Sequence, residues 1–135
     1  MTGTLTTSAA TATADQAAGL LDLADAILDG TITVPDTAAA RAAAVIARQV
    51  LEDAVERRCR ELAGTVGRPT GRSQLILVRE LGDADDAAKA QTAWDGLSRA
   101  CHHHSYELQP SVGEVRGLVG LVRAIADPRL RSQEG

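Results

Sequence analysis

Apolar and polar residues along this chain follow the period of the α-helix in five successive segments. Within each segment the apolar side chains recur every three to four residues, the spacing that gathers them on one face of a helix. Glycine or proline residues, which end helices readily, separate the segments. The pattern predicts helices over residues about 14–29, 36–63, 72–81 and 84–102, and a fifth from residue 111 onward.

The segment from Asp36 to about Ala63 predicts the longest helix, roughly 40 Å at about 1.5 Å per residue. Its apolar residues form two stripes, one of Ile46 with Val50 and one of Leu51, Val55, Cys59 and Leu62. A helix with two apolar stripes has neighbours on both sides. We therefore expect this helix to be the centre of a bundle.

The last two predicted helices each have one apolar face that should turn inward. In the fourth helix that face consists of Ala87, Ala90, Trp94, Leu97 and Cys101. In the fifth it consists of Val115, Leu118, Val119, Val122 and Ile125. Ser111 and Glu114 have the spacing of a capping box at the start of the fifth helix. Gly113, Gly117 and Gly120 indicate either reduced stiffness there or a close contact with another helix.

Composition supports an all-α fold. The chain is rich in alanine, contains no phenylalanine, and has one tryptophan and one tyrosine in 135 residues. Alanine favours helices, whereas a sheet core needs more β-branched and aromatic residues. We expect one domain over residues 14–127, an up-and-down bundle of four to five helices. Residues 1–13, mostly threonine and alanine, predict a disordered N-terminal tail, and residues 128–135 predict a flexible C-terminal tail.

Charge and hydropathy narrow the class of protein. The formal net charge is −4, which argues against a protein that coats nucleic acid. No apolar stretch reaches the length of about 18 residues that a membrane span needs, and the N-terminal residues do not resemble a secretory signal. With only two cysteines, a disulfide framework is not expected. These features predict a cytoplasmic protein that has no membrane partner.

The segment from Arg99 to Tyr106 concentrates the reactive side chains. It holds an arginine, a thiol, three histidines and the single tyrosine within eight residues. Imidazole is the side chain that ordinarily titrates between about pH 5 and 8. Because the residue before Pro110 avoids the α-helical region, the fourth helix should end between about His102 and Ser105. The histidines would then lie at a helix C-terminus.

Two interpretations of this segment need no catalysis. The histidines could cap the helix by donating to its last free carbonyl groups. Alternatively, Cys101 and His104 have the i, i+3 spacing of two metal ligands on one helix face, and thiolate with imidazole suits zinc. A closed zinc site needs two further ligands, and Cys59, the other cysteine, lies on an apolar stripe. Either interpretation fits a non-enzymatic helical interaction module.

The spacing of Arg99, His104 and Tyr106 resembles the Arg-x4-His-x-Tyr signature of the HEPN superfamily. The family consists of α-helical bundles of about this length, with the motif just before the last helix, and it includes ribonuclease toxins paired with antitoxins. Residues 98–122 also resemble actinobacterial members of this family. The position after the arginine is usually polar in active members, whereas this chain has Ala100.

The resemblance implies a function and assigns roles to three residues. His104 would be the acid/base group in RNA cleavage, Arg99 would hold the scissile phosphate, and Tyr106 would support the site. The implied activity is that of a metal-independent endoribonuclease without a cofactor, or of a degenerate relative that binds RNA or a nucleotide. The implied partners are a second copy in a homodimer and a protein antitoxin.

Charged clusters elsewhere favour structural roles. The arginines of the second predicted helix alternate with glutamate and aspartate, as expected of i, i+4 ion pairs on a solvated face. Asp83, Asp85 and Asp86 precede or begin the fourth helix, where negative charge is favourable. They could ligate magnesium, but N-terminal capping explains them without a metal ion.

Overall fold

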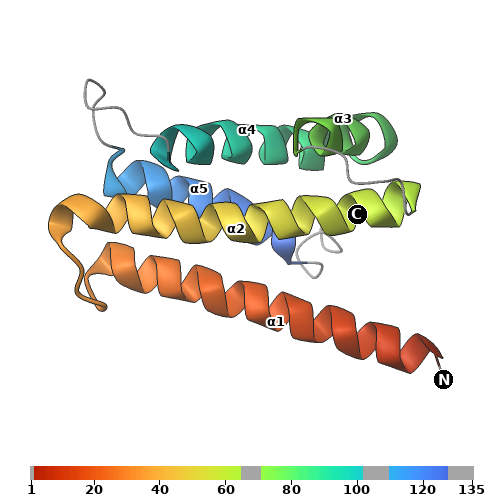
Figure 1. Ribbon diagram of the computed structural model, residues 1–135, viewed down its shortest axis with the longest axis horizontal. Coiled ribbons are helices and arrows are strands. Elements are labelled where there is room, and N and C mark those ends of the chain that lie inside the picture. Colours follow the sequence, from red (N-terminus) through yellow and green to blue (C-terminus); the bar gives the residue numbers. More distant parts are fainter. Residues whose placement is uncertain (1, 65–70, 102–109, 128–135) are drawn as a thin grey trace.

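The described part of the chain folds as an all-α helical bundle. A computed structural model describes residues 2–64, 71–101 and 110–127. They form five helices and no strand: α1 (Thr2–Asp29), α2 (Asp36–Ala63), α3 (Gly71–Leu81), α4 (Ala84–Cys101) and α5 (Val112–Ala126). In Figure 1, α1 and α4 run in one direction, and α2 and α5 run in the opposite direction. The predicted fold class is therefore confirmed.

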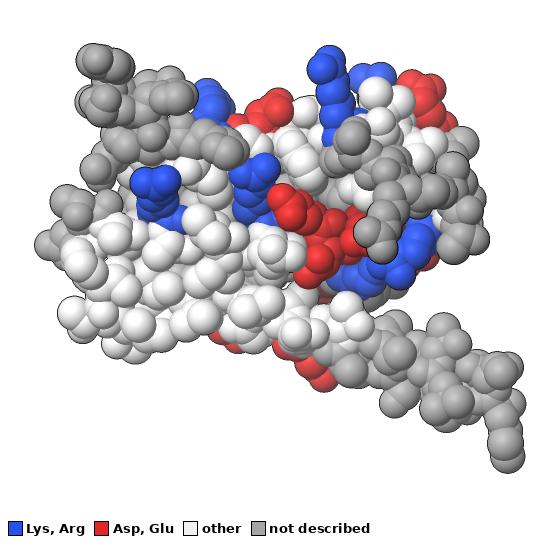
Figure 2. All heavy atoms as spheres, in the orientation of Figure 1, with Lys and Arg blue, Asp and Glu red and all other residues white. Residues whose placement is uncertain are grey.

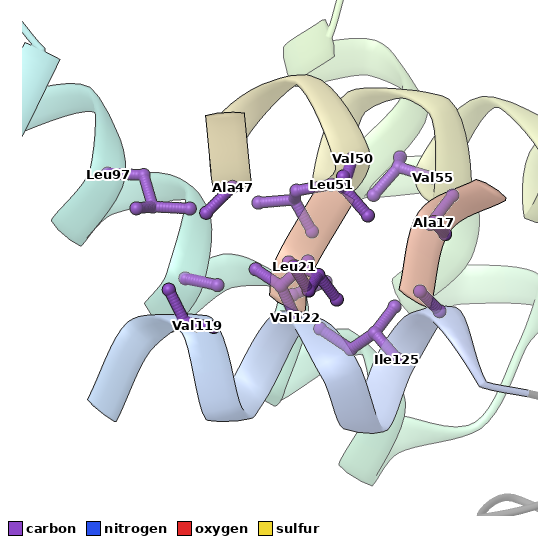
Figure 3. Close-up of a cluster of buried hydrophobic side chains, with 14 of the residues drawn as sticks. Ala17, Leu21, Ala47, Val50, Leu51, Val55, Leu97, Val119, Val122 and Ile125 are labelled. Carbon is purple, nitrogen blue, oxygen red and sulfur yellow. The ribbon is translucent and has the colours of Figure 1, made fainter. Parts of the chain in front are cut away.

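Helix α2 lies at the centre of this bundle. It packs against α1, α3, α4 and α5. Val50, Leu51, Val55 and Cys59 are all buried, which confirms the two apolar stripes and the prediction of neighbours on both sides. Figure 3 shows Leu51 and Val50 of α2 pointing toward Leu21 of α1 and Val122 of α5. These side chains form the middle of the core.

The N-terminal part of the chain differs from the expected disordered tail over residues 1–13. Helix α1 begins at Thr2, and its first half diverges from α2, so that it lies apart from the other helices (Figure 1). The low hydrophobicity of this segment suggested a tail, but its alanines favour the helical backbone even without an apolar face. The expected C-terminal tail over residues 128–135 lies outside the described residues.

Ion pairs connect the first helix to the last. Arg123 on α5 lies 3.1 Å from a carboxylate oxygen of Asp22 and 2.8 Å from one of Asp25. Arg116, about two turns before Arg123 on α5, pairs with Asp29 at 2.7 Å. These contacts fix α1 against α5 alongside the apolar core. No helix among the described residues is long and apolar enough to cross a membrane.

Candidate functional site

Of the three motif residues Arg99, His104 and Tyr106, Arg99 is the one that the structure describes. Arg99 lies in the last turn of α4 and is exposed to solvent. Cys101, the last residue of α4, is half-buried and packs against the core. His104 and Tyr106 lie outside the described residues, as does the expected end of the helix between His102 and Ser105. The site can therefore be built from Arg99 and the helices around it.

Helix α4 turns Arg99 outward because its opposite face is buried. Ala93, Leu97 and Ala100 are at most 3% exposed, and each faces the core. Successive residues on a helix are rotated by about 100°. Arg99, next to Ala100 in sequence, therefore points away from the core and along the edge that faces α5.

The start of α4 is held by an aspartate cap. Asp83 accepts hydrogen bonds from the backbone N–H of Asp85 at 2.7 Å and of Asp86 at 3.3 Å. Such a cap satisfies amide groups that the first turn leaves free. The capping interpretation of the acidic cluster is confirmed.

Helix α5 also begins at a side-chain cap. The hydroxyl of Ser111 accepts a hydrogen bond from the backbone N–H of Glu114 at 3.0 Å. This is the serine half of the predicted capping box. The cap places Glu114 in the first turn of α5, opposite the last turns of α4.

A cleft of about 650 Å³ separates these two helix ends. That volume lies in the range typical of small-molecule sites, about 300–1,000 Å³. Polar groups come from Arg99 and Thr92 on α4 and from Glu114 on α5. Apolar surface comes from Gly96, Ala100, Pro110 and Leu118. The cleft therefore combines a cation, a carboxylate and an apolar floor.

Gly96 sets how closely the two helices approach beside the cleft. A Cβ atom at this position would lie 2.7 and 2.9 Å from the two methyl carbons of Leu118 on α5. By contrast, a Cβ at Gly117 or Gly120 would meet nothing within 4 Å. The glycine at the close helix contact is thus on α4, and the alternative of a contact at Gly117 or Gly120 is wrong within the described residues.

The guanidinium of Arg99 has no carboxylate partner among the described residues. The ion pairs found there involve other arginines, and Glu114 in the same cleft forms none of them. A guanidinium presents several N–H donors in a plane and binds phosphate or carboxylate through two parallel hydrogen bonds. Arg99 is therefore available to an anionic ligand. Glu114 could accept hydrogen bonds from N–H groups elsewhere on that ligand.

The arginines of α2 do not form a comparable site. Arg48 pairs with Glu52, Arg58 with Glu61 and Arg60 with Glu56, all at 3.1–3.2 Å along the same helix. The prediction of a solvated face with alternating charges is confirmed for these residues. An RNA track along α2 would need uninterrupted positive charge, which these pairs do not provide.

The two cysteines have different surroundings. Cys59 is buried and its thiol donates to the backbone carbonyl of Gln74 on α3 at 3.2 Å. Burial, and then the nearby charge of Glu56, raise the pKa of the Cys59 thiol above its ordinary value. Across the described residues, no three His, Cys, Asp or Glu side chains form a group that could hold a metal ion. His104, half of the suggested Cys101–His104 zinc pair, lies outside them.

The raised pKa of Cys59 predicts that stability falls at alkaline pH. The unfolded thiol loses its proton above about pH 8.5, whereas the folded thiol keeps it to a higher pH, so the unfolded state gains stability as pH rises. Urea unfolding should be measured for wild type and Cys59→Ser at pH 7 and at alkaline pH. The free energy of unfolding of wild type, relative to that of Cys59→Ser, should fall as the pH rises. Serine keeps a hydroxyl donor but does not titrate. A constant difference across this pH range would contradict the prediction.

Sequence reasoning found Arg99 but missed the rest of the cleft. Thr92, Leu118 and Pro110 carry no motif, and Glu114 was noted only as a capping residue. The available signal was Gly96, an isolated glycine within the helical pattern of the fourth segment.

In comparisons of the chain with protein-family models, with curated proteins and with solved structures, none matched.

Proposed function

We propose that this protein binds RNA at the cleft between α4 and α5 and cleaves it as a metal-independent endoribonuclease of the HEPN type. The observation that carries the proposal is the exposed guanidinium of Arg99 in an open cleft, which forms no ion pair with a carboxylate of residues 2–64, 71–101 or 110–127. Arg99 holds the scissile phosphate, His104 transfers the proton, and Tyr106 supports the site. The roles of His104 and Tyr106 rest on the motif spacing alone.

The proposed reaction needs only groups that this chain and RNA supply. The 2′-hydroxyl loses a proton and attacks the adjacent phosphorus, and the bond from phosphorus to the 5′-oxygen breaks. The departing 5′-oxygen takes a proton, which leaves a cyclic phosphate and a 5′-hydroxyl. Imidazole can accept or donate these protons near neutral pH. The guanidinium stabilises the charge that grows on the phosphate oxygens.

RNA cleavage in the presence of EDTA tests this proposal. Wild type should cleave, while Arg99→Ala and His104→Ala should each lower the rate by about 100-fold or more. Arg79→Ala provides the matched control, because Arg79 is an exposed arginine on α3 away from the cleft, and its rate should not change.

The same assay distinguishes the outcomes. Cleavage that survives either Arg99→Ala or His104→Ala would contradict the enzymatic proposal, and so would wild type that does not cleave. If wild type binds RNA without cleaving it, and Arg99→Ala abolishes that binding, the protein is the degenerate RNA-binding relative instead. The proposal places the protein in the cytoplasm, with a protein antitoxin as an expected partner.

A non-enzymatic interaction module is the second candidate. Val45 on α2 and Leu23 on α1 favour it, because both are apolar and exposed on neighbouring helices. Under this alternative the protein forms a stable complex with an unrelated protein, and neither Arg99→Ala nor His104→Ala weakens that complex. Co-purification with the wild type and both variants provides the test.

A further inference from the structure

The cleft between α4 and α5 contains a carboxylate for which the proposed cleavage has no role. Glu114 is exposed in the first turn of α5 and lines the cleft together with Arg99 of α4. Both are described residues, and their side chains form no ion pair with each other. The cleft therefore holds two groups of opposite charge that are separately available to a ligand.

The carboxylate of Glu114 has no ion-pair or hydrogen-bond partner within the described part of the chain. Ser111 accepts a hydrogen bond from the backbone N–H of Glu114, but the glutamate side chain does not return the second bond of a capping box. Arg116, the next arginine along α5, pairs with Asp29 of α1 at 2.7 Å. Over the C-terminal half of α2, by contrast, acidic side chains lie next to basic ones (Figure 2). Glu114 is therefore free to accept hydrogen bonds from a ligand.

The two charged groups lie at one end of the cleft, beside an apolar surface. Helices α4 and α5 pack together and run in opposite directions, so the last turn of α4 lies beside the first turn of α5 (Figure 1). Further from that end, Gly96 of α4 meets Leu118 of α5. The volume of about 650 Å³ is large enough for a small molecule with a flat apolar body. A nucleotide combines such a body, its base, with an anion, its phosphate.

Guanine is the RNA base that best matches a free carboxylate. Its Watson–Crick edge presents two adjacent donors, N1–H and the amino N2–H, which a carboxylate can accept through two parallel hydrogen bonds. Adenine and cytosine place a ring nitrogen acceptor beside their amino group, and uracil places a carbonyl oxygen on each side of N3–H. Each of these three bases would set a lone pair against the second carboxylate oxygen, which costs free energy.

We propose that Glu114 makes this cleft selective for guanine nucleotides, by accepting hydrogen bonds from N1–H and N2–H of the base while Arg99 binds the phosphate. The inference deepens the proposed RNA function and rests on it for the contact of Arg99 with phosphate. Pro110 and Leu118 supply apolar surface for the faces of the base. Glu114 thus sets which nucleotide binds and takes no part in proton transfer.

The same recognition fits a guanine within RNA and a free guanine nucleotide. Both present the donor edge and a phosphate, and they differ in whether further nucleotides continue the chain. A 2′-O-methyl trinucleotide with a central guanine and guanosine 3′-monophosphate are therefore compared as probes. Tighter binding of the trinucleotide identifies RNA as the source, and tighter binding of the monophosphate identifies the free nucleotide; either result supports recognition of guanine.

Isothermal titration calorimetry of the full chain tests the selectivity. The probes are the 3′-monophosphates of guanosine, inosine and adenosine. Inosine keeps N1–H but lacks the N2 amino group, so the comparison removes one donor. Wild type should bind the guanosine probe about tenfold or more tightly than the inosine probe, because a hydrogen bond to a charged group is lost. The adenosine probe, which lacks both donors, should bind more weakly still.

Three variants separate the base contact from the phosphate contact. Glu114→Gln retains the size of the side chain and the backbone N–H that Ser111 caps, and it should abolish the preference for guanosine over inosine. Glu80→Gln is the matched control, because Glu80 is an exposed glutamate on α3 outside the cleft, and it should keep the preference. Arg99→Ala should weaken the binding of all three probes by the same factor.

The outcomes distinguish this inference from the proposed cleavage, because the titrations need no catalysis. The inference is overturned if wild type binds the guanosine and inosine probes equally, if it binds none of the probes, or if Glu114→Gln keeps the full preference. The comparison of guanosine with inosine uses wild type alone, so it does not depend on the folding of a variant. Selective binding of guanine without RNA cleavage would contradict the enzymatic proposal alone, and RNA cleavage without a preference for guanine would contradict this inference alone.

Discussion

Replacing Leu51 with alanine is expected to lower the free energy of unfolding by about 2–5 kcal/mol, the usual cost of removing a buried leucine side chain. Leu51 is fully buried on α2, the helix that packs against all the others. Its side chain points toward Leu21 of α1 and Val122 of α5 (Figure 3). Alanine would leave a cavity where three helices meet, and the cost within this range depends on how far the neighbouring side chains relax into it.

Urea unfolding followed by circular dichroism at 222 nm measures this loss. The control is Ile76→Ala, which removes a side chain of the same size from a position that is 45% exposed. Its cost should be well under half that of Leu51→Ala, because much of the side chain already contacts water. Similar losses for the two variants would mean that α2 is not the centre of the core.

Replacing Gly82 with alanine is expected to cost about 1–3 kcal/mol, as overpacking of a tight contact does. Gly82 follows α3, and its N–H donates to the carbonyl of Val78 at 2.9 Å. A Cβ at Gly82 would lie 2.8 Å from that carbonyl oxygen and 3.1 Å from a methyl carbon of Leu62. The oxygen belongs to the backbone of α3, so the end of the helix itself must shift.

Gly117→Ala is the matched control for this substitution. Gly117 lies within α5, and a Cβ there would meet nothing within 4 Å. Alanine at an unobstructed helical position should stabilise the protein by about 0.5–1 kcal/mol, since glycine loses more backbone freedom on folding. Thermal unfolding of both variants should shift the melting temperature in opposite directions. If Gly82→Ala also raises it, the turn between α3 and α4 is not the tight one described above.

The positions of the helices could be predicted from the sequence because two signals indicate the same boundaries: the spacing of the apolar residues, and the glycine, proline and capping residues at the helix ends. Helix α2 has the predicted bounds, α3 begins one residue earlier than predicted, and the predicted Ser111 cap begins α5. The start of α1 could not be predicted in this way. A segment of alanine and threonine without an apolar face gives no periodic signal, although its backbone is helical from Thr2.

The details of packing were less predictable than the helices. Trp94 and Cys101 were expected on the inward face of α4, yet both are half-buried, while Ala93 and Ala100 are buried. Periodicity places a stripe only to within one residue on either side. Ala93 and Ala100 lie with Leu97 on the buried face of α4, whereas Trp94 and Cys101 lie at its edges.

The candidate site was predictable only in part. The motif drew attention to Arg99, whose exposure follows from its place beside buried Ala100. The cleft depends on how α4 meets α5, and that approach is set by Gly96 against Leu118. No local pattern encodes which side chain of one helix faces a glycine of another.

The most direct test of RNA binding at the Arg99 cleft is a nuclear magnetic resonance titration of the 15N-labelled protein. The ligand is a short RNA with 2′-O-methyl groups, which cannot undergo the proposed cleavage. The amide signals of Thr92, Gly96, Ala100 and Leu118 should shift on addition of RNA, and Arg99→Ala should abolish those shifts. Shifts that are absent, that fall on α1 and α2 instead, or that persist in Arg99→Ala would contradict the account.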